Sequence, residues 1–168
     1  IEQLKLLKTV NGVGYIRITR TPVPVLYTPE ETKTMKIGGS KILHQSPADT
    51  VAVFACGVTL HEVLKAHEAL KFEGISIAVV DLYSIKPLDE EMIKKFSHLP
   101  VIIVEDHYPA GGIGEAVLSA LSNMHYPISN ITHLCVRKIP HSGTPEENLR
   151  YQEIDASAIV RAVKNISS

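Results

Sequence analysis

Short apolar runs alternate with segments of helical pattern over most of the chain. The runs are rich in β-branched residues, which is typical of parallel strands that are buried on both faces. Between them, apolar side chains recur at the three- and four-residue spacing of helices. This alternation predicts a three-layer α/β/α domain with a mostly parallel, mixed sheet of about five strands. The expected strands cover residues 36–45, 50–56, 75–82, 101–104 and 131–136, the first as a bulged edge strand.

Local signals mark where the expected helices begin and end. Thr59 and Glu62 have the spacing of a capping box, so we expect the first long helix to begin there and to end before Gly74. Asp89 is the expected N-cap of the next helix, and Asp155 is that of the last one. Such helices on both sides of the sheet complete the three predicted layers.

The beginning of the chain has a different pattern. Residues 14–20 alternate as a β-strand does, and three prolines between residues 22 and 29 then interrupt any regular element. A polar stretch of linker composition follows. We therefore predict a boundary near residues 21–35. Residues 1–35 would form the tail of a preceding domain with its linker, and residues 36–168 would form the α/β domain.

Composition excludes several classes of protein. The 17 basic and 18 acidic side chains are interspersed, which argues against nucleic acid or an anionic membrane as a partner. No apolar run approaches the roughly 20 residues of a membrane-spanning helix, and no signal-peptide pattern is present. Cys56 and Cys135 lie in apolar runs, so we expect free thiols in the reducing cytoplasm. The chain begins with Ile1, so we expect a piece of a longer protein.

Acidic residues and glycines follow the fourth expected strand. Glu105 and Asp106 must reach the surface at the carboxyl end of this strand, where open α/β sheets bind ligands. Gly111, Gly112 and Gly114 then begin a helix, and their N–H groups are a candidate anion or effector loop, as in a regulatory domain. The alternative is a tight turn, because the adjacent carboxylates repel phosphate and GGxG alone is a weak signal.

A nucleotide site is a second hypothesis. Gly57 follows an apolar strand and opens a helix, and Asp81 ends the next strand at nearly the spacing of a ribose-binding acid. The turn has a single glycine where close approach of a pyrophosphate calls for three, so the dinucleotide fingerprint is incomplete. A free-standing nucleotide-binding domain is therefore an alternative interpretation.

Histidines and arginines near strand ends are further candidates. His61, His107 and His141 lie in or beside turns, where an imidazole acts as acid, base or ligand, or simply caps a surface. No histidines or cysteines have the spacing of a metal motif, and no nucleophile–base pair is recognisable, so we predict no metal ligands and no catalytic residues. Arg17 and Arg20 end the first expected strand, where an arginine fork would hold a phosphate or form a surface ion pair.

Four ordered segments resemble the carboxyl-terminal part of transketolase, and the likeness is closest to the animal branch. Each segment is weak alone, but their order across roughly residues 50–165 is specific. The β subunits of 2-oxoacid dehydrogenases and deoxyxylulose-phosphate synthase share the same last domain and are alternatives. The segments are GVTLHE at 57–62, IKPLD at 85–89, VEDHY with GGIGEAV between 104 and 117, and THL with PHSG between 132 and 143; YIRITR at 15–20 resembles the last strand of the family's pyrimidine-binding domain.

The resemblance implies an enzyme of the pentose phosphate pathway that moves a two-carbon ketol unit between sugar phosphates. It implies a homodimer that uses thiamine diphosphate with Mg²⁺ or Ca²⁺. The family's GDG and Asn-Asn cofactor motifs are not present here, and its activating glutamate belongs to the region before Ile1. We therefore expect this chain to bind no cofactor, to lack turnover alone, and to serve as a structural, dimer-supporting module for the rest of the enzyme. Arg20 matches the arginine that binds the sugar phosphate, although the Thr21–Pro24 continuation departs from the family.

Overall fold

A computed structural model describes residues 2–20, 22–123 and 131–167. Within these residues the core is a five-stranded sheet in the order β1-β3-β2-β4-β5. The edge strand β1 is antiparallel to β3 and has a register shift of the predicted kind, whereas all other neighbours are parallel. The predicted mixed, mostly parallel sheet is confirmed. The strands are β1 (Lys41–His44), β2 (Asp49–Ala55), β3 (Ser76–Asp81), β4 (Val101–Val104) and β5 (Ile131–Leu134).

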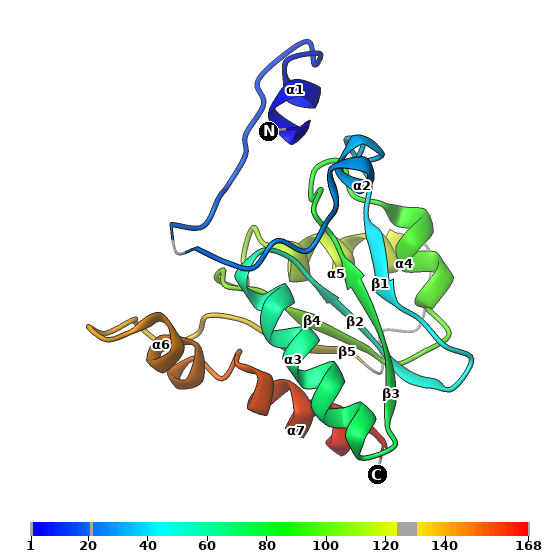
Figure 1. Ribbon diagram of the computed structural model, residues 1–168, viewed down its shortest axis with the longest axis vertical. Helices are drawn as coiled ribbons and strands as arrows, with labels where there is room; N and C mark the ends of the chain where they lie inside the picture. The colour runs from blue at the N-terminus through cyan, green and yellow to red at the C-terminus, as the bar shows by residue number, and fades with distance from the viewer. Residues whose placement is uncertain (1, 21, 124–130, 168) are drawn as a thin grey trace.

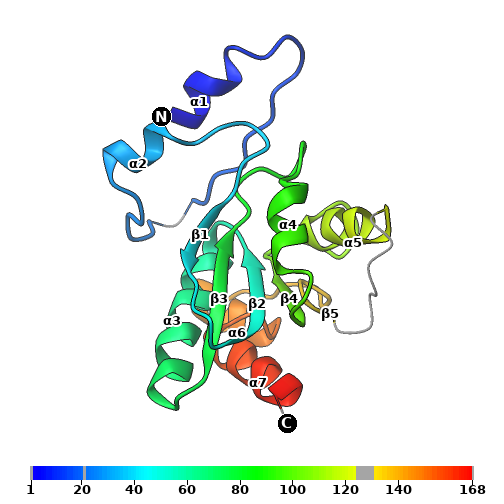
Figure 2. The ribbon, with the colours of Figure 1, turned by 90° about the vertical axis from the view of Figure 1, so that its right-hand side faces the viewer.

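Two pairs of helices cover the two faces of the sheet (Figure 2). The helices α3 (Val58–Phe72) and α7 (Ala156–Ser167) lie on one face, and α4 (Glu90–Phe96) and α5 (Ile113–Asn123) lie on the other. The three-layer α/β/α prediction is therefore confirmed. In the described part of the chain, no helix has the length and apolar character needed to cross a membrane.

The alternation of side chains along β2 explains why the sheet has two cores. Val51 and Val53 point toward α3 and α7, whereas Ala52 and Phe54 point toward α4 and α5, because successive residues of a strand face opposite sides. All four are fully buried. A strand covered on both faces must be apolar at every position, so it reads as a continuous apolar run. Because β2, β3 and β4 are parallel, their carboxyl ends lie at one edge of the sheet.

The N-terminal segment lies outside the three layers (Figure 1). It comprises α1 (Glu2–Leu7), an extended stretch and α2 (Pro29–Lys33), and neither helix contains a buried residue. The strand expected at residues 14–20 is extended but pairs with no other described strand, so the prediction of a strand there is wrong for this structure. A strand needs a neighbour to satisfy its backbone groups, and no described strand lies beside it. The boundary near residues 21–35 stays a prediction.

Helix ends follow the sequence signals in two cases. The carboxylates of Asp89 and Asp155 each accept the N–H of the residue three positions on, at 3.1 Å, which confirms both predicted caps. The helix α6 (Pro145–Tyr151) was not predicted, although Thr144 and Glu147 form a complete capping box at its start. It is one short helix with no buried residue, so it has no apolar periodicity to detect.

Candidate functional site at the carboxyl edge of the sheet

The strand order creates a switch point beside β2. From β2 the chain passes through α3 to β3 on one side, and β4 lies on the other side. In open α/β sheets the carboxyl ends of the strands at such a point enclose a crevice in which ligands bind. Cys56 and Gly57 follow β2, and Glu105, Asp106 and His107 follow β4. We call the edge formed by these strand ends and the end of β3 the carboxyl edge.

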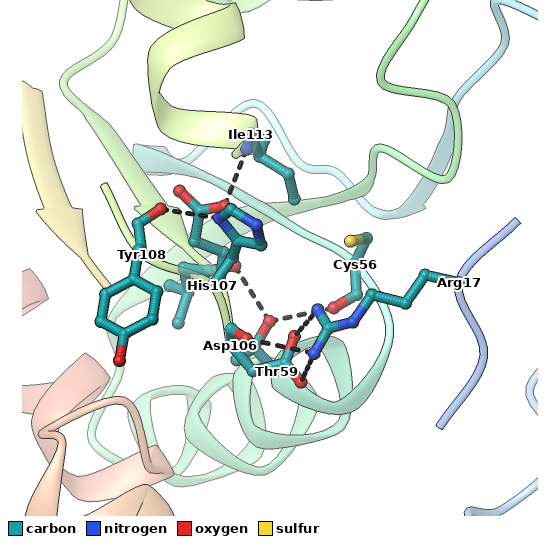
Figure 3. A network of polar contacts seen from close by, with 9 residues as sticks. Arg17, Cys56, Thr59, Asp106, His107, Tyr108 and Ile113 are labelled. Carbon is teal, nitrogen blue, oxygen red and sulfur yellow. Dashed lines mark hydrogen bonds and ion pairs between the residues drawn. The ribbon is translucent and has the colours of Figure 1, made fainter. Parts of the chain in front are cut away.

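The side chain of Arg17 reaches the carboxyl edge from the N-terminal segment and lies beside Cys56 and Thr59 (Figure 3). Its Nη1 donates to Oδ1 of Asp106 at 2.9 Å, and its Nη2 donates to Oδ2 at 3.0 Å and to the Asp106 carbonyl at 3.3 Å. This is the bidentate fork that a guanidinium forms with a carboxylate. The two side chains are 53% and 29% exposed, so water screens the pair. Its main effect is to hold the N-terminal segment against the end of β4.

Thr59 connects the ends of β2 and β4. The residue is fully buried, and its hydroxyl lies 2.9 Å from the carbonyl oxygen of Val104 and 3.0 Å from that of Cys56. A hydroxyl has one hydrogen to donate, which these two buried carbonyls share. Without it, the buried carbonyl of Val104 would lose a donor, so Thr59 stabilises the contact between the ends of β2 and β4.

The predicted Thr59–Glu62 capping box is wrong. The helix α3 begins at Val58, and its N-cap is Gly57, which has a φ of 59° and forms no side-chain cap. The Thr59 hydroxyl donates to the carbonyls of Cys56 and of Val104, on β4, instead of accepting a helix N–H. The Glu62 carboxylate accepts the N–H of Ala156 at 3.0 Å, at the start of α7. Two tertiary partners therefore outcompete the local capping interaction.

Glu105 is a buried carboxylate at the centre of the carboxyl edge, with 2% of its surface exposed. Its Oε2 accepts the N–H of Ile113 at 2.7 Å, and its Oε1 accepts the N–H of Gly114 at 3.0 Å. The Nε2 of His133, on β5, lies 2.6 Å from Oε1. Glu105 therefore provides the negative charge that the N-terminus of α5 favours, and it joins β4, β5 and α5.

The glycines of the candidate anion loop allow this close approach. Gly111 has a φ of 79°, which glycine adopts without strain. A Cβ on Gly112 would lie 2.0 Å from Oε2 of Glu105, so a larger residue would displace the carboxylate. The N–H groups of Ile113 and Gly114 already bind Glu105. Binding of an external anion at Gly111, Gly112 and Gly114 stays a prediction, and it would have to compete with this internal carboxylate.

The end of β3 carries a second buried acid. Tyr27, in the linker, donates its phenolic O–H to Oδ2 of Asp81, while Oδ1 is buried without a partner among the described residues. Burial raises the pKa of Asp81 to about 6, because the charged form loses its hydration. Burial and the adjacent Asp81 also raise the pKa of Tyr27. Asp81, the candidate ribose-binding acid, is thus paired with a side chain of its own chain.

Neither cysteine is activated as a nucleophile. Burial, reinforced by the nearby Asp81 carboxylate, raises the pKa of Cys56 to about 12. Burial also raises the pKa of Cys135. The thiolate is the reactive form, so both side chains stay protonated at neutral pH and behave as small apolar groups. Both are free thiols.

The other candidate residues occupy separate places. Arg20 is exposed at a bend of the N-terminal segment, and its role in binding phosphate stays a prediction. The Nδ1 atoms of His107 and His141 lie 2.8 and 3.1 Å from the carbonyl oxygen of the next residue, so both rings are held locally. His61 is partly buried on α3. Of the two arginines, Arg17 forms the surface ion pair that was the alternative to phosphate binding.

Sequence reasoning missed Tyr27 and His133 as members of this edge. His133 lies on β5 opposite Ile103 of β4, which brings its ring to Glu105 at the end of β4. A histidine within a short apolar strand is a usable signal, because a buried polar side chain needs a partner. Tyr27 lies in a proline-rich linker, where no periodic pattern indicates which side chain is buried.

The fold and its edge define a three-layer α/β domain in which paired acidic side chains lie at the strand ends beside the switch point. A family model described as the C-terminal domain of transketolase matches residues 40–159. The chain is 40% identical over 166 residues to the transketolase of Homo sapiens, covering 97% of this chain and 26% of that protein. It is 42% identical over 164 residues to the transketolase-like protein 1 of Bos taurus, covering 96% and 27%.

A comparison with solved structures also finds a transketolase. A split-gene transketolase, described as an inactive beta4 tetramer, superposes with a TM-score of 0.76 at 30% sequence identity, covering 88% of this chain and 47% of that one. The chain therefore belongs to the transketolase family and contains its C-terminal domain, as the four ordered segments predicted. The chain spans about a quarter of the length of the curated relatives it matches.

Proposed function

We propose that this chain is part of a transketolase that transfers a two-carbon ketol unit between sugar phosphates in the pentose phosphate pathway. The family membership supports this proposal. The whole enzyme would act as a cytoplasmic homodimer, with thiamine diphosphate and Mg²⁺ or Ca²⁺ bound by other parts of the protein. The cofactor supplies the carbanion chemistry, and the protein around it supplies binding and orientation.

The residues of this chain fit a supporting role better than a cofactor site. A diphosphate needs unpaired N–H donors and cations, whereas the carboxyl edge presents Asp81, Glu105 and Asp106. The helix N–H groups of Ile113 and Gly114 are bound to Glu105. The described residues therefore do not fit a thiamine diphosphate site, and no catalytic step is assigned to them.

We propose that this chain contributes to the reaction through Arg20, which would bind the phosphate group of the sugar. The single observation that carries this assignment is that contacts on both sides of Arg20 hold its segment against the domain. Arg17 precedes it and forms the bidentate pair with Asp106, and Tyr27 follows it and binds Asp81. Anchors on both sides restrict where the exposed Arg20 guanidinium can point, which reduces the entropy that phosphate binding would cost.

Replacing Arg20 by alanine in the full-length enzyme tests the assignment. A charge-assisted hydrogen bond contributes about 1.5–3 kcal/mol, so KM for phosphorylated sugars should rise about 10- to 100-fold. KM for an unphosphorylated sugar should change little. Arg150→Ala is the matched control, because Arg150 is an exposed arginine on α6, far along the chain. Equal increases for phosphorylated and unphosphorylated substrates would contradict the phosphate-binding role.

A second measurement tests the supporting role of the chain itself. The chain alone should show no turnover of xylulose 5-phosphate, even with added thiamine diphosphate and Mg²⁺, and thiamine diphosphate should not shift its melting temperature. A thermal shift with NADH would instead favour the nucleotide-binding alternative. Measurable ketol transfer by the chain alone would refute the proposal that the chemistry is housed elsewhere in the enzyme.

A further inference from the structure

Two histidines and a glutamate meet on the face of the sheet opposite α4 and α5, away from the carboxyl edge. His44 ends the edge strand β1, and His67 and Glu68 lie in the middle of α3. A ligand atom from each of the three side chains lies within 4.8 Å of the other two. The imidazole rings of His44 and His67 are stacked, with centroids 3.9 Å apart and planes inclined by 15°.

The cluster is partly shielded from water, and this favours the neutral imidazole of His44, the form that binds metals. His67 is buried and His44 is partly buried. Burial lowers the pKa of His44, and the adjacent His67 lowers it further. The Nδ1 of His67 lies 3.2 Å from Oε1 of Glu68, so the carboxylate is already beside the ring. Among the other charged groups near His44, Asp49 and Lys71 have opposite signs.

We propose that His44, His67 and Glu68 form a binding site for a divalent transition-metal ion such as Zn²⁺, Ni²⁺ or Cu²⁺. Two imidazoles and one carboxylate are a donor set that these ions prefer, and Ca²⁺ and Mg²⁺ favour all-oxygen sites. Three protein ligands leave at least one coordination position for water or an external ligand. The site joins β1 to α3, so bound metal would hold the edge strand to the helix layer.

The stacked rings indicate what binding must change. The lone pairs of an imidazole lie in its ring plane, so the lone pairs of two stacked rings lie in two nearly parallel planes, and no single ion can lie in both planes. One ring must turn for both nitrogens to reach one ion at about 2.0–2.1 Å. His44 is the ring with room to turn, because it lies on the edge strand and is less buried than His67. Metal binding should therefore separate the stacked rings.

Titration calorimetry of the chain with ZnCl₂ and with NiCl₂ tests the site. We expect saturable binding of one ion per chain, weakened at least about tenfold in His44→Gln, in His67→Gln and in Glu68→Gln. Glu68 is exposed, so Glu68→Gln is a variant that leaves the core intact. The matched control is His98→Gln, because His98 is an exposed histidine that follows α4 on the opposite face. This control should bind with unchanged affinity.

Nuclear magnetic resonance gives an independent readout. Zn²⁺ should shift the ring signals of His44 and His67 together and leave those of His98 unchanged. No saturable binding, or unchanged affinity in either His44→Gln or His67→Gln, would overturn the proposal. Unchanged affinity in Glu68→Gln would overturn the three-ligand site, and equal weakening in His98→Gln would show that binding is adventitious. Melting curves of each variant establish that lost binding is not lost folding.

Discussion

Replacing Glu105 by glutamine would test how the carboxyl edge is held together. Glutamine has the size of glutamate, so packing is preserved, but only one of its two terminal atoms accepts a hydrogen bond. If the amide oxygen takes the place of Oε1, the N–H of Ile113 faces an NH₂ group. If it takes the place of Oε2, the N–H of Gly114 does. In either orientation at least one buried donor loses its acceptor.

The contacts of Glu105 allow the cost to be worked out. A buried donor without a partner costs about 1–3 kcal/mol. The remaining bonds, including that of His133, lose their charge assistance, about 1 kcal/mol each. Loss of the negative charge at the N-terminus of α5 adds about 0.3–1 kcal/mol. Relief of the desolvation of a buried charge offsets part of the sum. We expect a net loss of about 2–4 kcal/mol in the free energy of unfolding.

Urea denaturation followed by circular dichroism measures this difference. The slope of the free energy against urea should be unchanged, so that the shift in midpoint reports stability alone. Glu91→Gln is the matched control, because Glu91 is in the first turn of α4 but is exposed. It removes the same charge near a helix N-terminus without breaking a buried bond, so its cost should stay below about 0.5 kcal/mol.

A double-mutant cycle separates the contribution of His133. Glu105→Gln and His133→Gln remove two ends of one contact, so their effects should fall short of additive by about 0.5–1 kcal/mol or more. The reasoning is refuted if Glu105→Gln costs less than about 1 kcal/mol, or no more than Glu91→Gln. In that case the glycine-rich turn, and not the carboxylate, would position α5.

Three further predictions concern the same edge. Burial raises the pKa of Asp81 from 3.8 to about 6. The folded state therefore binds this proton more tightly than the unfolded state does. As pH rises from about 4 to about 6, the free energy of unfolding should fall by on the order of 3 kcal/mol. In urea melts at several pH values, Asp81→Asn should remove this loss and be the more stable protein at pH 7. Thr59→Val should cost about 1–2 kcal/mol in the same assay, against less than about 0.5 kcal/mol for the exposed Thr50→Val. Asp106→Asn should accelerate trypsin cleavage after Arg20 by up to about fivefold, because an exposed ion pair contributes up to about 1 kcal/mol; an unchanged rate would contradict the anchoring of this segment.

Much of the fold could be predicted because its signals are local. The run at residues 101–104 coincides with β4, and the caps at Asp89 and Asp155 lie where their spacing placed them. Periodicity and capping depend on neighbours within one or two turns, which a single sequence contains. The family likewise followed from short segments in a fixed order, because each segment includes a strand end, a turn or the start of a helix in one domain.

The prediction of the capping box failed because its side chains have other hydrogen-bond partners in the folded domain. Thr59 and Glu62 have the spacing of a capping box, and the same spacing at Thr144 and Glu147 forms one. The difference lies outside the local sequence, because the hydroxyl of Thr59 meets the carbonyl of Val104 on a neighbouring strand. A buried carbonyl at the end of β4 needs a donor, whereas Thr144 lies on an exposed helix with no such competitor. Spacing alone cannot distinguish these two cases.

Contacts between side chains of distant elements could not be predicted from the sequence either. Arg17 could be recognised as a fork for an anion, but its partner Asp106, just after β4, comes 89 residues later. His44 and His67 belong to no short metal motif, because one lies on a strand and the other on a helix. Their proximity depends on the order of the strands, which places β1 beside β3 and under α3.

The contacts at the carboxyl edge are those expected if this domain supports the rest of the enzyme, as we propose. Each acid at a strand end has a partner from its own chain: Asp81 binds Tyr27, Asp106 binds Arg17, and Glu105 binds the start of α5. Two of these partners belong to the N-terminal segment, so this segment contacts the strand ends at which other α/β proteins bind ligands. An exposed ion pair and one hydrogen bond stabilise this contact only modestly, yet they enclose the exposed Arg20 between them. If Arg20 binds the sugar phosphate, as we propose, the contribution of this edge would be to restrict the position of that arginine.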